Sequence, residues 1–222
     1  MISVTGKNWS QQKVNKNLVE KVKQDYGLDH ILSHLIISRN YDSSEIFSIN
    51  NSQKLTNIFK DDYDYHKASL ILLDVIKNNE NICILGDYDV DGSCATSLLV
   101  RYFNHINQQH FFYIPDRVKD GYGASKKLFQ KLILKKPKLI IMVDCGSNSY
   151  DAIDYLNQKN IRSIIIDHHE INHPYPRSDV IINPKKDPIK KENSLLCATA
   201  LTYFFIDILI KKTKSNFKLP NF

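Results

Sequence analysis

The sequence predicts an α/β fold, in which a parallel sheet carries helices on both faces and follows a small helical N-terminal region. From residue 66 onward, short apolar runs alternate with helix-length segments, and this alternation is typical of a parallel sheet with crossover helices. The run LIIMV at 139–143 is apolar at consecutive positions, as a strand buried on both faces requires. Hydrophobic residues make up 42% and charged residues 24% of the chain, so a globular protein is expected.

The length of 222 residues allows one substantial domain and an appendage. Residues 11–38 have helical periodicity with a break at Tyr26-Gly27, and residues 41–65 are rich in Asp, Asn and Ser, with a short helix around 43–47. We therefore expect a helical region and connecting segment at 1–65, followed by a catalytic domain at 66–222.

The elements of the second domain follow from the same patterns. We expect strands at 82–85, 111–114, 139–143, 163–166 and 180–182. We expect helices at 66–78, 93–105, 125–134, 149–157 and 195–211.

Charge and cysteine usage narrow the class of protein. The formal net charge is +6 and lysine doublets recur in the second half of the chain, which favours a polyanionic partner. The longest apolar stretch, 198–210, contains Thr and Asp and is too short to span a bilayer, so no membrane segment is expected. Four separated cysteines without a CxxC motif indicate a reduced, cytoplasmic protein, which we expect to be a monomer.

Acidic residues and histidines follow three of the predicted strands. Asp87 and Asp89, in the stretch GDYDVDG at 86–92, follow the first strand; Asp144 follows the third; and the triplet Asp167-His168-His169 follows the fourth. The carboxyl ends of parallel strands form the ligand-binding edge of open α/β sheets. These side chains are therefore expected to gather at one site.

Three kinds of chemistry compete for the GDYDVDG stretch. A calcium loop of the EF-hand type needs a glutamate at its twelfth position, where this chain has Leu98. A haloacid-dehalogenase-like phosphatase matches DVDGS at 89–93 locally, but its later motifs do not fit strands that end in Asp144 and Asp-His-His. A pair of divalent cations about 3.5–4 Å apart accounts for all of these residues. Oxygen ligands with one imidazole nitrogen favour Mn²⁺ or Mg²⁺.

Four segments in this order carry a resemblance to a known family: IPDRVKDGYG at 114–123, IMVDCG at 141–146, IIIDHHE at 164–170 and VIINPKK at 180–186. Together with GDYDVDG they resemble the DHH phosphoesterase superfamily, and within it the RecJ-type single-strand-specific DNA exonucleases. The resemblance implies a nuclease that degrades single-stranded DNA from the 5′ end in repair and recombination, with two Mn²⁺ or Mg²⁺ ions as cofactors.

The same resemblance assigns roles to individual residues. It implies that His169 faces the scissile phosphate, that Asp167 orients the histidine pair, and that Asp91 and Gly92 support the turn. The metal ligands that it implies are Asp87, Asp89, Asp144 and His168.

Substrate contacts are expected from three further positions. Arg117 precedes the turn Gly121-Tyr122-Gly123, and a guanidinium group can clamp a phosphate with paired hydrogen bonds. Tyr122, or alternatively Tyr113, can stack on a base. Asn183 is expected to contact the substrate.

The chain also departs from the family pattern. In the family, a further metal-binding aspartate and additional domains lie beyond the region that matches the last helix here, and residues 196–200 lack the usual glycines. We therefore expect the chain to be the amino-terminal portion of a longer enzyme. Two alternatives stay open: a DHH enzyme for small substrates (oligonucleotides, cyclic dinucleotides or pyrophosphate), and a non-catalytic DNA-binding remnant.

Overall fold

The computed structural model describes residues 2–8, 10, 12–50, 56–121, 123–186 and 191–220. It divides the chain into two compact units, Met1–Thr56 and Asn57–Phe222. Among the described helices, none is long and apolar enough to cross a membrane.

The first unit is a small helical module of α1 (Lys16–Tyr26), α2 (His30–Ser38) and α3 (Ser43–Asn50). Asn15 and Asp29 cap the first two helices with side-chain hydrogen bonds. Gly27 ends α1 in the left-handed conformation (φ 65°), which explains the break read at this point in the sequence. The core of the module consists of Val22, Ile36 and Ile46.

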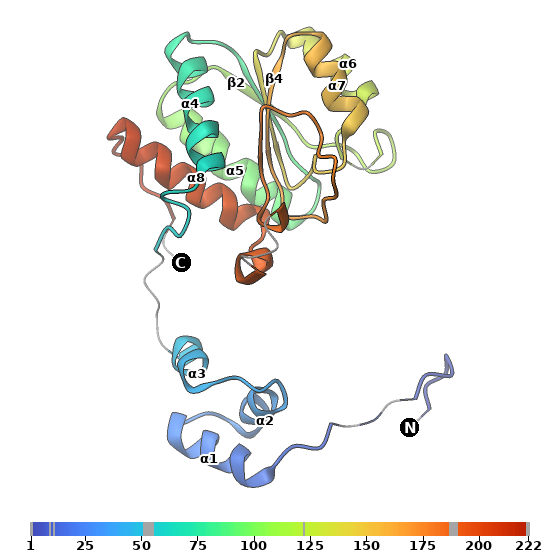
Figure 1. Cartoon of the computed structure of the whole chain (residues 1–222), viewed down its shortest axis with the longest axis vertical. Helices are drawn as coiled ribbons and strands as arrows, with labels where there is room; N and C mark the ends of the chain where they lie inside the picture. The colour runs from blue at the N-terminus through green and yellow to red at the C-terminus, as the bar shows by residue number, and fades with distance from the viewer. Residues whose placement is uncertain are drawn as a thin grey trace. The chain divides into compact units, whose positions relative to one another are not determined.

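The second unit contains a parallel sheet, and the α/β fold class expected from the sequence is confirmed (Figure 1). In the described part of the chain its strand order is β2-β1-β3-β4-β5, and every neighbouring pair is parallel. The strands are β1 (Ile82–Leu85), β2 (His110–Tyr113), β3 (Leu139–Val143), β4 (Arg162–Ile166) and β5 (Val180–Ile182).

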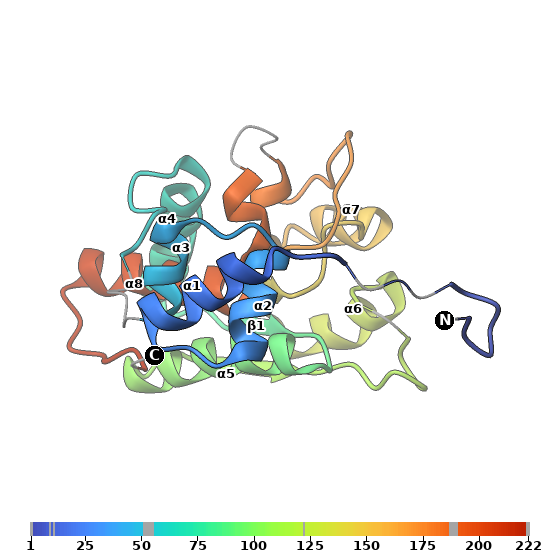
Figure 2. The same cartoon turned by 90° about the horizontal axis from the view of Figure 1, so that it is seen from below.

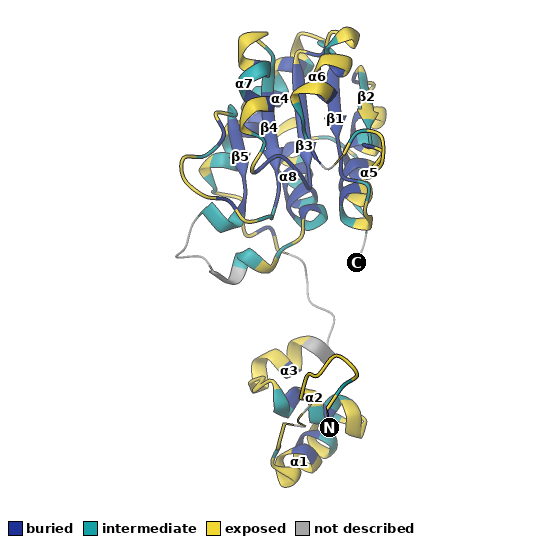
Figure 3. Cartoon of the chain, turned by 90° about the vertical axis from the view of Figure 1, so that its right-hand side faces the viewer, coloured by how far each residue is buried: buried dark blue, intermediate teal, exposed yellow. Residues whose placement is uncertain are grey.

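Helices cover both faces of this sheet, and Figure 2 shows the two groups on opposite sides. The helices α4 (Tyr63–Lys77), α5 (Val90–His105) and α8 (Ala198–Thr213) pack against strand residues such as Ile84 and Ile141. The helices α6 (Lys126–Leu132) and α7 (Tyr150–Gln158) pack against the alternate residues, such as Leu85 and Met142. The central strands are therefore buried on both faces (Figure 3), as their continuous apolar runs require.

The strand register brings the residues that follow β1, β3, β4 and β5 to one edge of the sheet. Leu85 pairs with Met142, Val143 with Ile166, and Ile166 with Ile182. The backbone N–H groups of Asp144 and Asp167 extend the ladder by donating to Ile166 and Ile182, at 2.9 and 3.0 Å. The acidic residues that follow β1, β3 and β4 consequently lie side by side at the carboxyl-terminal edge of the sheet.

The boundary between the units lies nine residues earlier than the expected division at 65/66. Packing explains the difference: the Phe59 ring meets the Phe204 ring of α8 edge to face, with centroids 5.6 Å apart, and Asn57 donates to the Phe204 carbonyl at 3.0 Å. The last part of the expected connecting segment therefore belongs to the core of the second unit.

Three short 3₁₀ helices complete the described elements: Ile133–Lys135, Pro184–Lys186 and Lys191–Leu195. The expected strands and helices are all present, with bounds that differ by at most three residues. The largest shift with consequences for the site is in α5, which begins at Val90 rather than at 93.

Candidate metal centre

The loop between β1 and α5 holds Asp87 and Asp89. Asp87 is buried, and its Oδ1 accepts the Tyr88 N–H at 2.7 Å. Asp89 is the N-cap of α5, and its Oδ1 accepts the Gly92 N–H at 2.9 Å. A Cβ at position 92 would lie 2.6 Å from the backbone N and O of Asp87, so only glycine lets the helix begin this close to the buried carboxylate.

Asp91 and Gly92 therefore lie in the first turn of α5 and not in a turn before it. The Asp91 carboxylate accepts the N–H groups of Ala198 and Thr199 at 2.7 and 2.8 Å, so it caps the start of α8 from another helix. Its Oδ2 also lies 3.5 Å from Nε2 of His168. The supporting role expected for Asp91 is thus directed at α8 and His168.

Asp144 is almost completely buried, with 1% of its surface exposed. It follows β3 in the left-handed conformation (φ 60°), which aspartate tolerates better than most residues. Both of its carboxylate oxygens are buried without a hydrogen bond, and Nε2 of His168 lies 3.2 Å from Oδ1. A buried carboxylate without hydrogen bonds is costly, and a bound cation would compensate it.

Asp167 organises the two histidines that follow it. Its Oδ1 accepts the backbone N–H of His168 at 2.8 Å and of His169 at 3.2 Å, and it lies 2.7 Å from Nδ1 of His169. Its Oδ2 accepts the Ser147 N–H at 3.0 Å. Asp167 is therefore hydrogen-bonded to the backbone of both histidines and to the imidazole of one.

Burial and charge shift the pKa values of this cluster in opposite directions. Burial, together with the nearby Asp91 and Asp89 carboxylates, raises the pKa of Asp144 to about 8. Burial also raises the pKa of Asp87. Burial acts in the same sense on Asp167, but hydrogen bonds from His169 and Ser147 outweigh it and lower the pKa of Asp167 to about 2. The bond to Asp167 raises the pKa of His169.

Two overlapping groups of side chains in the described residues can each hold a metal ion. One consists of Asp87, Asp89 and Asp144, and the other of Asp144, His168 and His169; within each group the ligand atoms lie within 4.8 Å of one another. Asp144 belongs to both groups, so it would contribute a ligand to an ion at either position. The donors are carboxylate oxygens and imidazole nitrogens, which suit Mn²⁺ or Mg²⁺, and the residues fit the expected metal pair.

Arg117 lies next to this cluster through Tyr88. Its guanidinium carbon is 5.4 Å from the centroid of the Tyr88 ring. Tyr88 stands in the sequence between the ligand candidates Asp87 and Asp89, and Arg117 is exposed to solvent. Tyr113 donates to Asp120 at 2.6 Å and so fixes the loop that carries Arg117. Tyr122 lies outside the described residues.

Asn183 takes part in a buried hydrogen-bond network beside His169. It is buried, and its Nδ2 donates to Ser147 Oγ at 2.8 Å and to the His169 carbonyl at 3.0 Å. Its Oδ1 accepts the Lys185 N–H at 2.9 Å. The side chain connects the loops after β3, β4 and β5. Sequence reasoning missed Ser147 in this network, although it directly follows the segment IMVDCG at 141–146.

Comparison with known proteins identifies similar chains. The chain is 28% identical over 181 residues to the single-stranded-DNA-specific exonuclease RecJ of Bacillus subtilis, covering 80% of this chain and 23% of that protein. It is 27% identical over 141 residues to RecJ of Escherichia coli, covering 63% and 24% respectively. The chain thus spans about a quarter of the length of the curated relatives it matches.

Solved structures and a family model agree with the fold. A crystal structure of exonuclease RecJ bound to manganese matches with a TM-score of 0.65 and 23% identity, covering 72% of this chain and 40% of that one. RecJ from Thermus thermophilus with Mn²⁺ matches with a TM-score of 0.67 and 18% identity, covering 90% and 28%. Residues 81–221 match the model of the DHH family, N-terminal domain. The resemblance read from the sequence is confirmed, and the chain belongs to the DHH family.

Proposed function

We propose that this chain is the metal-binding part of a single-stranded-DNA-specific exonuclease that acts from the 5′ end and uses two Mn²⁺ or Mg²⁺ ions. The observation that carries the proposal is the position of Asp144, whose buried carboxylate belongs to both groups of candidate ligands. Similarity to RecJ exonucleases of several bacteria supports the choice of substrate.

Each side chain of the site has a part in this reaction. Asp87, Asp89, Asp144 and His168 hold the ions, which supply Lewis acidity to activate water and to offset charge on the phosphate. His169 faces the scissile phosphate, and Asp167 keeps its imidazole oriented through the bond to Nδ1. Arg117 binds a phosphate of the strand with its exposed guanidinium group.

The partner and setting follow from charge and from the similar proteins. A net charge of +6 suits a polyanionic strand. We infer a role in DNA repair and recombination, as a monomer in the cytoplasm. Affinity for a single strand should fall as salt rises, because each neutralised phosphate releases counterions.

A digestion assay in Mn²⁺ tests the proposal. The substrates are 5′-labelled and 3′-labelled single strands, a blunt duplex, a dinucleotide and pyrophosphate. The proteins are the wild type, Asp89→Asn, and the control Asp151→Asn, which changes an exposed acid on α7. We expect the wild type and the control to release nucleotides from the 5′ end of single strands only, and Asp89→Asn to lose this activity.

Other outcomes would contradict the proposal. Turnover of only the dinucleotide or pyrophosphate would indicate a small-substrate enzyme. Binding of single strands without turnover in any metal would indicate a non-catalytic DNA-binding protein. Equal activity in the wild type and Asp89→Asn would show that the proposed metal centre does not take part in the reaction.

A further inference from the structure

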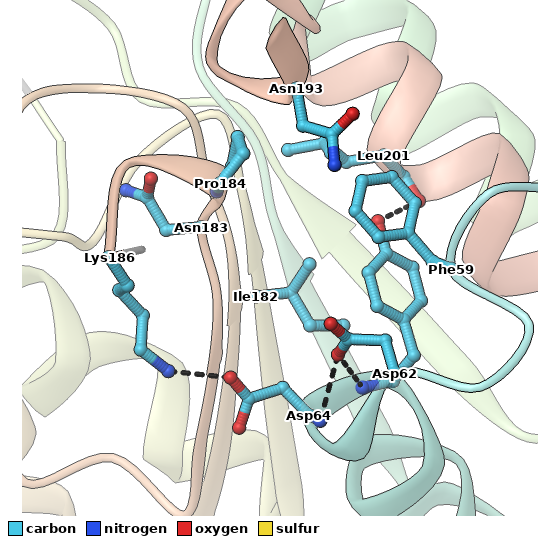
Figure 4. Close-up of a pocket in the computed structure, with 10 residues that line it drawn as sticks. Phe59, Asp62, Asp64, Ile182, Asn183, Pro184, Lys186, Asn193 and Leu201 are labelled. Atoms are coloured by element: carbon cyan, nitrogen blue, oxygen red, sulfur yellow. Dashed lines mark hydrogen bonds and ion pairs between the residues drawn. The ribbon is translucent and has the colours of Figure 1, made fainter. Parts of the chain in front are cut away.

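The second unit contains a cavity of about 250 Å³ between the start of α4, the end of β5 and the start of α8. Figure 4 shows its lining, with Ile182 of β5 between side chains of α4 and the residues that follow β5. All of the lining residues belong to the second unit. None of them is among the candidate metal ligands.

The cavity lies beside the metal centre. Ile182 pairs with Ile166 of β4, and neighbouring strands are about 4.8 Å apart. Asn183 both lines the cavity and donates to the His169 carbonyl at 3.0 Å. On the other side, Leu201 lies two residues beyond Thr199, whose N–H is bound by Asp91. The side chain of Asn183 therefore lies between the cavity and the loop that carries His169.

The inner wall of the cavity is apolar and partly aromatic. The Phe59 and Tyr65 rings stack on each other at an interplanar angle of 13°, and Ile182 and Leu201 are buried beside them. The Tyr65 hydroxyl donates to the Leu201 carbonyl at 3.4 Å, so the ring is held in place. Flat apolar walls of this kind accept the face of an aromatic ring system.

The rim of the cavity is polar and carries an excess of negative charge. Lys186 forms an ion pair with Asp64 at 2.6 Å and also donates to the Ile181 carbonyl, so its charge is compensated. Asp62 uses Oδ1 to cap α4 by accepting the Asp64 and Tyr65 N–H groups. A rim with two carboxylates and one ammonium group disfavours a phosphate. It favours a ligand whose edge donates hydrogen bonds, such as the amino group of a base.

We propose that this cavity binds the nucleobase of a nucleotide next to the scissile phosphodiester. Its volume is below the roughly 300–1,000 Å³ of pockets for drug-sized ligands, which suits one ring system. The base lies on the apolar wall of Phe59, Tyr65, Ile182 and Leu201, and its edge meets the carboxylate of Asp62. This inference rests on the proposed function, since it assigns one base of the same single strand.

An abasic scan tests the inference without altering the protein. A fluorescent single strand of ten nucleotides is prepared with an abasic site at each position in turn, and its binding to the chain is measured by anisotropy with metal withheld. Loss of one stacked base typically weakens binding about five- to tenfold or more. We expect a loss of this size at one position near the 5′ end and smaller losses elsewhere.

A cavity-filling variant connects that position with the cavity. In Leu201→Phe, the added ring volume should weaken binding of the intact strand about as much as the abasic site weakens binding to the wild type. Combining the variant with the abasic strand should cause no further loss of affinity. Tyr203→Phe, in the same helix but not in the lining, is the matched control and should bind like the wild type. Thermal melting establishes that each variant is folded.

A second variant covers the case in which Leu201→Phe does not fold. Asn is as good an N-cap as Asp, so Asp62→Asn keeps the cap of α4 while it removes the anionic acceptor. We expect the wild type to prefer cytosine or adenine over thymine at the sensitive position, and Asp62→Asn to lose at least half of that preference. An unchanged preference would overturn the assignment of Asp62.

The possible failures are distinguishable. Equal losses at all abasic positions, or a sensitive position that stays sensitive in a folded Leu201→Phe, would overturn the base site and leave the exonuclease proposal standing. The absence of any binding to single strands would overturn the proposed function, and this inference would fall with it.

Discussion

The Nδ1 atom of His169 lies 2.7 Å from Oδ1 of Asp167, and the same oxygen accepts the backbone N–H of His168 at 2.8 Å. One carboxylate thus fixes the imidazole of one histidine and the backbone that carries the other. Asp167 can act on the reaction through these two neighbours without contacting a metal ion or the substrate.

Asp167→Asn should disturb His169 more than it disturbs metal binding. The hydrogen bond to Asp167 and the charge of that carboxylate raise the pKa of His169; the change removes the charged acceptor, so this pKa should fall in the metal-free protein. Supporting residues of this kind usually contribute about 10–100-fold to activity or metal affinity, and we expect a loss of that size in kcat. An NMR titration of the histidine C2–H signals measures the shift, with His34 of the first unit as the internal control. An unchanged His169 titration would contradict this account.

Asp144→Asn should abolish binding of both ions. Asn tolerates the left-handed backbone that position 144 adopts (φ 60°), so the fold should persist, whereas the carboxylate charge common to both groups of ligands is lost. We expect activity to fall on the order of 100-fold or more. Isothermal titration with Mn²⁺ measures binding, and Asp151→Asn is the control. Retention of two Mn²⁺ ions per chain would show that Asp144 is not a shared ligand.

Metal binding should strengthen as the pH rises to about 8. The pKa of Asp144 is raised from 3.8 to about 8, so below that pH a proton must leave before a cation binds. Apparent affinity should therefore fall by up to about tenfold per pH unit below pH 8. In Asp144→Asn this part of the pH dependence should be absent. Calorimetric titrations in buffers of different ionisation enthalpy measure the number of protons released when the metal binds.

The same pKa shift sets the sign of a stability effect in the metal-free protein. Between pH 3.8 and about 8, the folded state holds a proton on Asp144 that the unfolded state has released. The stabilising contribution of Asp144 is therefore complete below pH 3.8 and is lost as the pH rises to about 8. The melting temperature of the wild type should fall relative to that of Asp144→Asn between these two pH values. Saturating Mn²⁺ should reverse the trend. A parallel pH profile for the two proteins would contradict the assignment.

Tyr88 should matter for substrate affinity through Arg117. Its ring lies 5.4 Å from the guanidinium carbon, and such exposed contacts contribute about 0.5–1 kcal/mol. Tyr88→Phe should retain this contact, whereas Tyr88→Leu should raise KM about two- to fivefold with little change in kcat. Arg117→Lys, which loses paired hydrogen bonding, should raise KM further. Steady-state kinetics on single strands distinguish these cases, and an equal effect of Phe and Leu would argue against the contact.

Gly92→Ala should damage the loop that holds Asp87. A Cβ at this position would lie 2.6 Å from the Asp87 backbone N and O. The backbone of the loop would have to move to relieve this clash. We expect a loss of about 2–4 kcal/mol in the free energy of unfolding and weaker metal binding. Urea unfolding measures the first, and Ser93→Ala, at the exposed neighbouring position, is the control. Unchanged unfolding would mean that the loop relaxes freely.

The sequence by itself determined the α/β class, the order of strands and helices, and the residues expected at the metal centre. These features depend on local signals: apolar runs of strand length, helical periodicity and short motifs that directly follow strands. Because parallel strands end at one edge, placing Asp87, Asp144 and His168 after their strands was enough to predict that they meet.

Only the tertiary structure decided which atoms share a contact and at what burial. Asp91 caps α8 across 107 residues of chain, and Asn183 ties Ser147 to the His169 carbonyl. The boundary at 56/57 depends on Phe59 and Asn57, which both contact Phe204 of α8, far along the chain. Long-range packing of this kind leaves no periodic trace in the sequence. The depth of Asp144, and with it the raised pKa, arises from the layers that close around it.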